Sequence, residues 1–215
     1  MTEQQWLASI DTLEMLFHVE ENVSGRKLRL LACACCRQES VWRFLTNESS
    51  RVAIGVSEQF ADGQADDKDL IGAALAIPQG RTTGASRNPR RLSLHCQATR
   101  AAVAATRLDE REAANETLRM TANSSGSQQS DLLREIIGNP FRLHLVSTFW
   151  LAWNDGTVPR LARDIYEDRT FADLPILSDA LEEAGCDDGA ILDHLRSPGP
   201  HVRGCWALDL VLGKE

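Results

Sequence analysis

Six cysteines and five histidines are the side chains of this 215-residue chain best suited to metal or redox chemistry. Three of the cysteines, Cys33, Cys35 and Cys36, lie within the stretch "LACACCR". A helix here would point the three thiols in different directions, with Cys35 beside Leu28 and Leu31 on the apolar face and Cys33 among arginines. We therefore expect a buried Cys35, an exposed and more reactive Cys33, and no metal bound by this stretch.

A second group lies near the C-terminus, where Cys186, His194, His201 and Cys205 fall within twenty residues. Their spacing permits a zinc site between neighbouring helices. However, His201, Cys205 and Leu208 recur at i, i+4 and i+7, which is typical of the packed stripe of a final helix that begins near His201. This pattern favours a hydrogen-bonded core histidine, and we predict no metal-ligating residue and no cofactor.

Motifs for other chemistry are missing from the sequence. It contains no Gly-rich phosphate loop, no G-x-S-x-G and no H-E-x-x-H, so we predict no catalytic residue. The acidic pairs at 182–183 and 187–188 occur where helix ends are expected. A group of four aromatic residues consists of Phe141, Phe149, Trp150 and Trp153. Such a group either lines a ligand pocket or packs one helix onto its neighbours, and the spacing favours packing.

Nearly every segment has helical periodicity, which predicts an all-α fold, either a multi-helix bundle or stacked helical hairpins in two closely packed lobes. In the last third, helix starts are expected at Thr157, Asp173 and Asp187, the first two because a capping residue precedes a proline by two positions. Expected helices in the first part cover residues 2–8, 11–19, 26–44, 48–61, 66–76 and 92–121.

Two polar stretches interrupt this pattern, residues 78–91 and 121–129, and both are expected to be mobile loops. The sequence predicts a single domain, 1–215, with sub-lobes 1–121 and 130–215. The first stretch carries no aromatic residue, so a solvated loop is favoured over a basic arm for phosphate or an acidic partner. It carries four arginines: Arg81, Arg87, Arg90 and Arg91.

The formal charge of −8 comes from the second half of the chain, since residues 108–215 carry 10 Lys/Arg and 19 Asp/Glu. This acidity disfavours a general nucleic-acid binder. The apolar runs are shorter than the ~20 residues of a membrane span, and the N-terminus does not resemble a secretory signal. We therefore expect no membrane contact, a cytoplasmic location and free thiols.

Three stretches, residues 26–37 ("RKLRLLACACCR"), 138–142 ("GNPFR") and 174–214 (ending "HVRGCWALDLVLGK"), resemble a multi-paralogue family of uncharacterised bacterial proteins. The resemblance covers both ends of the chain, implies that the chain is a complete member, and implies no activity, cofactor or site residue.

Short-turned helical hairpins without converging polar chemistry favour a non-enzymatic interaction or adaptor module with a protein partner. Two alternatives remain open: a metal- or thiol-dependent enzyme or redox sensor, and a nucleic-acid-linked regulatory protein that uses residues 78–91.

Overall fold

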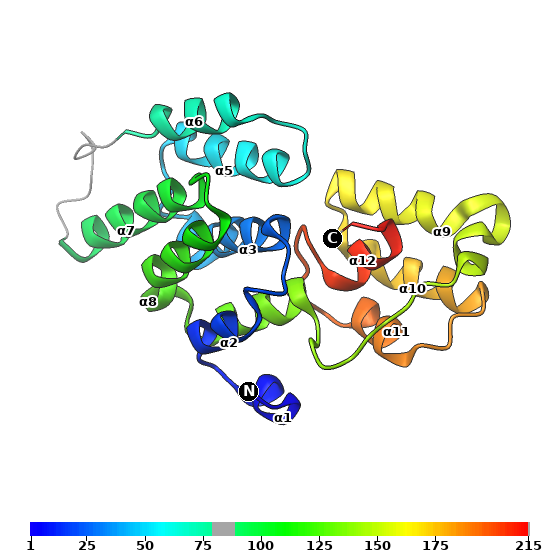
Figure 1. Ribbon diagram of the computed structural model, residues 1–215. Helices are drawn as coiled ribbons and strands as arrows, with labels where there is room; N and C mark the ends of the chain where they lie inside the picture. Colours follow the sequence, from blue (N-terminus) through cyan, green and yellow to red (C-terminus); the bar gives the residue numbers. More distant parts are fainter. Residues whose placement is uncertain (79–88, 215) are drawn as a thin grey trace. The chain divides into compact units, whose positions relative to one another are not determined.

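The computed structural model describes residues 1–78 and 89–214, without the side chains of 89–92 and 123–127. Within these residues the chain forms twelve α-helices and one 3-10 helix and contains no strand, so the all-α prediction is confirmed (Figure 1). The helices are α1 (Glu3–Ala8), α2 (Thr12–Val19), α3 (Gly25–Arg37), α4 (Glu39–Trp42), α5 (Glu48–Ala61), α6 (Asp67–Ala76), α7 (Pro89–Ala105), α8 (Glu110–Ile137), α9 (Thr148–Asp168), η1 (Phe171–Asp173), α10 (Leu174–Glu183), α11 (Gly189–Arg196) and α12 (Trp206–Leu212). The chain divides into two compact units, Met1–Leu133 and Arg134–Glu215.

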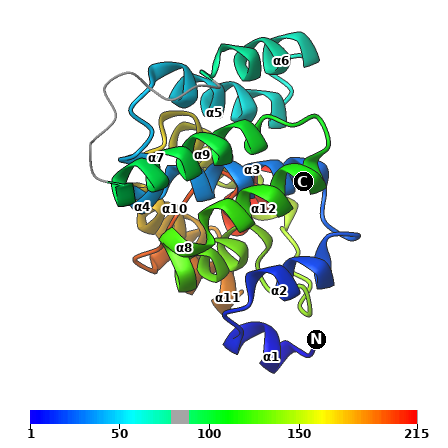
Figure 2. The same cartoon turned by 90° about the vertical axis from the view of Figure 1, so that its left-hand side faces the viewer.

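The first unit is built around α3, which packs against both α5 and α7 (Figure 2). Ser24 begins α3 by accepting a hydrogen bond from the backbone N–H of Lys27. Arg29, on the side of α3 expected to face solvent, is only 1% exposed. Its guanidinium donates hydrogen bonds to the backbone carbonyls of Arg107 at 2.7 Å and Leu108 at 2.9 Å, just after α7. The side of α3 that carries Arg29 is therefore buried within the unit.

The prediction that Cys33 is exposed is wrong, whereas the prediction that Cys35 is buried is confirmed. Arg37 forms a two-pronged ion pair with the buried Glu58 of α5, at 2.6 and 2.7 Å. A helical wheel counts arginines as solvent-facing, but Arg29 and Arg37 form hydrogen bonds and an ion pair with groups inside the unit. The thiol of Cys33 is fully buried and lies near both arginines.

The long helix expected over 92–121 is instead divided between α7 and α8, with a turn at 106–109. Four alanines form the buried face of α7: Ala98, Ala101, Ala102 and Ala105. Ser57 of α5 donates a 2.6 Å hydrogen bond to the carbonyl of Ala105, a close approach between helices that small side chains allow. Of the predicted loop 78–91, residues 79–88, with Arg81 and Arg87, lie outside the described residues, and 89–91 begin α7.

The loop predicted at 121–129 is wrong in its secondary structure, because α8 is helical through these positions. The amide of Gln129 nevertheless donates to the carbonyl of Leu118 at 3.1 Å and to the hydroxyl of Thr121 at 2.6 Å. Along a straight helix, residues eight and eleven positions apart are separated by about 12 and 16 Å, beyond the reach of a glutamine side chain. The chain therefore changes direction between Thr121 and Gln129.

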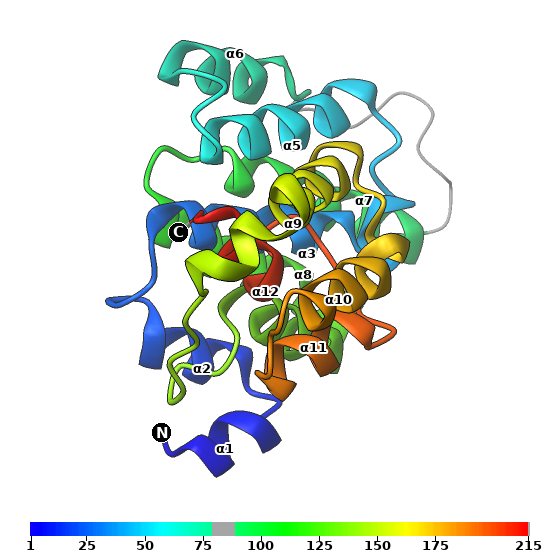
Figure 3. The same cartoon turned by 90° about the vertical axis from the view of Figure 1, so that its right-hand side faces the viewer.

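The second unit contains α9 to α12, in which α10 packs on α9 and α11, and α12 packs on α9 and α11 (Figure 3). The predicted helix starts are largely confirmed. Residues 153–156 leave helical geometry within α9 and the helix resumes at Thr157. α10 begins at Leu174 with Pro175 in its first turn, and α11 begins at Gly189, two residues after the expected Asp187.

The helix start predicted near His201 is wrong, since α12 begins at Trp206. Pro198, Gly199 and Pro200 end the preceding helix, and Gly204 has a positive φ of 96° that breaks any helix from 201 onward. His201 and Cys205 therefore do not share a helical stripe with Leu208. No helix within the described residues has the length and apolar character needed to cross a lipid bilayer.

Candidate metal centre

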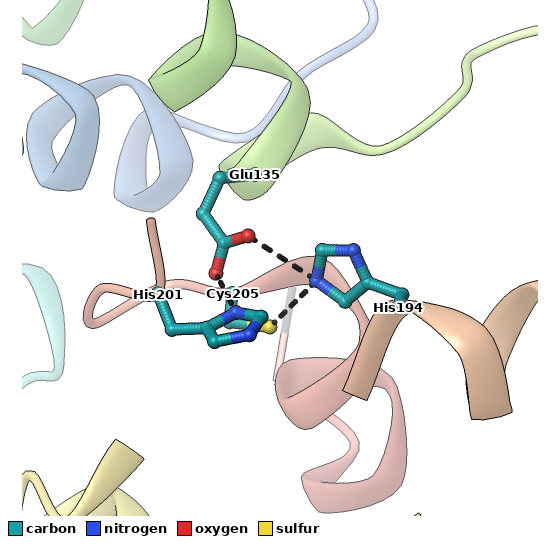
Figure 4. A group of neighbouring side chains, drawn as sticks. All are labelled: Glu135, His194, His201 and Cys205. Carbon is teal, nitrogen blue, oxygen red and sulfur yellow. Dashed lines mark hydrogen bonds and ion pairs between the residues drawn. The ribbon is translucent and has the colours of Figure 1, made fainter. Parts of the chain in front are cut away.

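Four potential metal ligands converge within the second unit (Figure 4). Glu135 comes from the last turn of α8, His194 from α11, His201 from the loop before α12, and Cys205 from the residue that precedes α12. Their side chains point toward one another, and one ligand atom from each lies within 4.8 Å of all the others. Three separate segments therefore contribute to one point.

The distances between these atoms suit a single bound ion. His194 Nε2 lies 3.2 Å from Glu135 Oε2 and 3.2 Å from Cys205 Sγ. His201 Nδ1 lies 3.1 Å from Glu135 Oε1. Ligand atoms around a tetrahedral zinc ion, with bonds of about 2.0–2.3 Å, are separated by about 3.3–3.6 Å. These three separations are within a few tenths of an ångström of that range, and the remaining pairs of ligand atoms lie within 4.8 Å.

The loop that carries His201 depends on glycine. A Cβ at Gly199, whose φ is +89°, would lie 2.6 Å from the backbone nitrogen of His201. No side chain fits there, so only glycine lets the chain turn sharply enough to bring His201 back toward Glu135. Gly204 has a φ of +96° immediately before Cys205, and the Cys205 N–H donates to the carbonyl of Val202 at 3.0 Å.

A hydrogen bond to the backbone selects the tautomer of His201. Its Nε2 lies 2.9 Å from the carbonyl oxygen of Ser197, which can only accept, so Nε2 carries the hydrogen. In a neutral ring this leaves the lone pair of Nδ1 directed at the cluster, where a metal would need it. Without a metal, Nδ1 must instead be protonated to donate to Glu135.

Burial and pairing set the charges of the cluster. Burial disfavours ionisation of Glu135, but hydrogen bonds from His194 and His201 outweigh it and lower the pKa of this carboxyl. Burial also disfavours protonation of His201, yet its bond to Glu135 raises the pKa of the imidazole. For Cys205, burial and the charge of Glu135 raise the pKa of the thiol well above its ordinary value. The metal-free cluster therefore holds protons that a bound ion would displace.

The structure brings together three of the four residues singled out near the C-terminus. Cys186 is buried in the core of the second unit and is not a member of the converging group. Glu135 is the member of the cluster that the sequence did not reveal. Its signal is weak: an acidic residue at i+3 from Leu132 and beside Ile136, on the apolar face of a helix.

The cysteines of α3 have a different environment. Burial raises the pKa of Cys33 to about 12, with the nearby Glu58 charge acting in the same direction, and burial raises the pKa of Cys35 to about 12. Cys36 is also fully buried, and burial raises its pKa. At neutral pH these thiols are protonated and shielded from solvent, which argues against the thiol-dependent alternative at this stretch.

The aromatic residues singled out between 141 and 153 divide into two pairs. Trp150 and Trp153 pack against the core of the second unit, in agreement with the packing interpretation. Phe149 is 83% exposed, so packing is the wrong interpretation for it, whereas Phe141 is 41% exposed. The acidic residue Asp188 accepts hydrogen bonds at the start of α11, the helix-end position expected for it.

Comparisons of the chain with protein-family models, with curated proteins and with solved structures found no match.

Proposed function

We propose that this protein is a non-enzymatic interaction module whose second unit, Arg134–Glu215, folds around one structural Zn²⁺ ion. The observation that supports a zinc site is the convergence of ligand atoms from Glu135, His194, His201 and Cys205 within 4.8 Å of one another. His201 is hydrogen-bonded and only 7% of its side chain is exposed, as the sequence suggested. The convergence supports a metal in addition, because donors from α8 and α11 meet His201 at this point.

The donor atoms indicate the class of ion. Two imidazole nitrogens, one sulfur and one carboxylate oxygen are the ligands that Zn²⁺ combines in tetrahedral sites. Ca²⁺ and Mg²⁺ take oxygen ligands and would gain little from three of these four groups. A thiolate together with imidazoles therefore supports a borderline-soft transition metal, of which zinc is the one that prefers this geometry.

The same geometry supports a structural role over a catalytic one. Catalytic zinc keeps one position open for water or substrate, whereas four protein donors complete a tetrahedron. Cys205 is fully buried and Glu135 is 4% exposed, which leaves little access to a substrate. The loop 197–205 contains no helix of its own. The ion would join this loop to α8 and α11.

Elemental analysis tests the metal. Protein prepared without chelator should contain about one zinc per chain, and His194→Ala and Cys205→Ala should each contain less than about 0.2. Cys186→Ala is the matched control, because it removes another buried thiol of the same unit and should leave the zinc content unchanged. A wild-type value below about 0.2, after loading with zinc and removal of the excess, would contradict the proposal.

The interaction role rests on large apolar side chains that the fold leaves in solvent. Leu143, Leu145 and Phe149 are 85%, 71% and 83% exposed within seven residues of one another. Such a group is typical of a surface that a protein partner covers. A partner that co-purifies in fixed stoichiometry should be lost from the double variant Leu143→Ser, Phe149→Ser while zinc is retained. Unchanged binding by that variant would contradict a role for this surface.

A further inference from the structure

Trp206 packs directly against the candidate metal centre. The centroid of its ring system lies 5.0 Å from that of His194, one of the four ligands, with the two planes at 49°. On another side it lies 4.9 Å from the ring of His144, at 37°. Trp206 also follows the ligand Cys205 directly in the chain. The indole of Trp206 therefore contacts the ligand His194, and its backbone directly follows the ligand Cys205.

The segment that carries a third ligand is shaped to receive this indole. Gly138 lies three residues after Glu135 and has a φ of +75°. A Cβ at this position would lie 3.0 Å from Cγ of Trp206 and 3.1 Å from Cδ2. Any side chain here would displace the ring, so the absence of one lets Trp206 pack beside the end of α8.

His144 is itself anchored to the helix that carries His194. Its Nδ1 donates to one carboxylate oxygen of Asp188 at 2.7 Å. The other oxygen of Asp188 accepts the N–H groups of Ala190 at 3.0 Å and Ile191 at 3.3 Å, which begin α11. Asp188 thus joins the first turn of α11 to His144, and His144 contacts Trp206, which contacts the His194 ring near the other end of the same helix.

We propose that Asp188, His144 and Trp206 are positioning residues that hold the His194 imidazole in its metal-binding orientation. This proposal rests on the function proposed above. The Nε2 atom of His194 must point at the ion, and a ring that contacts the imidazole restricts its rotation before the ion arrives. Groups that hydrogen-bond to a metal ligand typically change metal affinity by about 10- to 100-fold, and we take this range for the ring contact of Trp206.

The experiment compares zinc affinity across a set of variants, measured by competition with a chromophoric chelator. Trp206→Leu removes the ring contact, and Trp206→Phe is the conservative variant that keeps an aromatic face. Asp188→Asn keeps a side chain that caps α11 well but loses the carboxylate that accepts from His144. Arg196→Gln is the matched control, since it removes exposed ion pairs of α11 with Asp179 and Glu182.

The same proteins are loaded with Co²⁺ and their visible absorption spectra are recorded. These spectra report the geometry of the ligands, which a change confined to folding stability would not alter. We expect Trp206→Leu to weaken zinc binding by about 10- to 100-fold and to alter the cobalt spectrum, with Trp206→Phe restoring most of both. Asp188→Asn should weaken binding less, and Arg196→Gln should match the wild type.

Wild-type affinity and an unchanged cobalt spectrum in both Trp206→Leu and Asp188→Asn would overturn the positioning role while leaving the metal site intact. If Trp206→Leu does not fold by circular dichroism, Asp188→Asn and His144→Gln decide, because both replace side chains that are partly exposed, at 27% and 12%. A wild-type protein that binds no zinc would overturn this proposal together with the proposed function.

Discussion

The cysteines of α3 and Cys205 are equally buried but have different neighbours. Cys33, Cys35 and Cys36 follow one another along a single helix, and the thiol of Cys33 donates a hydrogen bond to the carbonyl of Ile54 at 3.8 Å. Cys205 lies at a chain turn, with His194 Nε2 at 3.2 Å. Crowding of thiols in the sequence therefore did not mark the candidate metal centre.

The difference has a geometric cause. Successive positions of a helix are rotated by about 100°, so neighbouring side chains diverge. Ligands converge when separate segments end at one place, as α8, α11 and the loop 197–205 do. Among the residues that the structure describes, this is the group of His, Cys, Asp or Glu side chains that meets in this way.

Removal of the metal should give the largest contrast between the two units. If zinc is present at about a thousand times its dissociation constant, binding contributes about 4 kcal/mol to the free energy of unfolding of the second unit. Hydrogen exchange should therefore accelerate in peptides from 134–215 after treatment with a strong chelator and stay unchanged in peptides from 1–122. Equal acceleration in both, or in neither, would remove the contrast.

Alkaline pH should affect the first unit through its buried thiols. The pKa of Cys33 and of Cys35 is raised from about 9 to about 12 by burial. The folded state thus holds these protons more tightly than the unfolded state, so their stabilising contribution is complete below pH 9 and is lost as the pH rises toward 12. The urea midpoint of the first unit should therefore stay constant up to about pH 9 and fall as the pH rises from about 9 toward 12.

The variant Cys35→Ala removes one of these two groups and provides the control for that titration. Its urea midpoint should fall less steeply with pH than that of the wild type. Identical slopes for the two proteins would show that other groups cause the alkaline loss.

At neutral pH the same Cys35→Ala change should have the smallest effect. It deletes one sulfur atom from a closely packed core and should cost about 1 kcal/mol of unfolding free energy, measured by urea denaturation. Zinc content should not change, because Cys35 belongs to no group of converging ligands among the described residues. Loss of zinc from this variant would place a ligand in α3 and contradict the difference drawn between the cysteines of α3 and Cys205.

Much of the fold was predictable because its signals are local. Pro175 in the first turn of α10, and the helix that resumes at Thr157, act within a few residues of the chain. The exposure of Cys33 was mispredicted because whether an arginine faces solvent depends on partners distant in sequence. Arg29 meets its partners 78 and 79 residues away, at Arg107 and Leu108.

Three of the four residues of the candidate site could be singled out from the sequence, because the fourth is distant along the chain. His194, His201 and Cys205 are close enough in sequence to attract attention, but Glu135 precedes His201 by 66 residues. The spacing of His201 and Cys205 also matched a helical stripe, and Gly204, with its positive φ of 96°, excludes that helix. A pattern of periodicity that contains a glycine is weak support for a continuous helix.

X-ray absorption at the zinc edge tests the central claim most directly, because it counts the sulfur atoms bound to the ion. With Cys205 as the one thiolate, the spectrum of the zinc-loaded protein should fit a single sulfur at about 2.3 Å and three nitrogen or oxygen atoms at about 2.0–2.2 Å. A shell without sulfur would contradict the centre at Cys205. Two or more sulfurs would mean that other cysteines, such as those of α3, bind the ion instead.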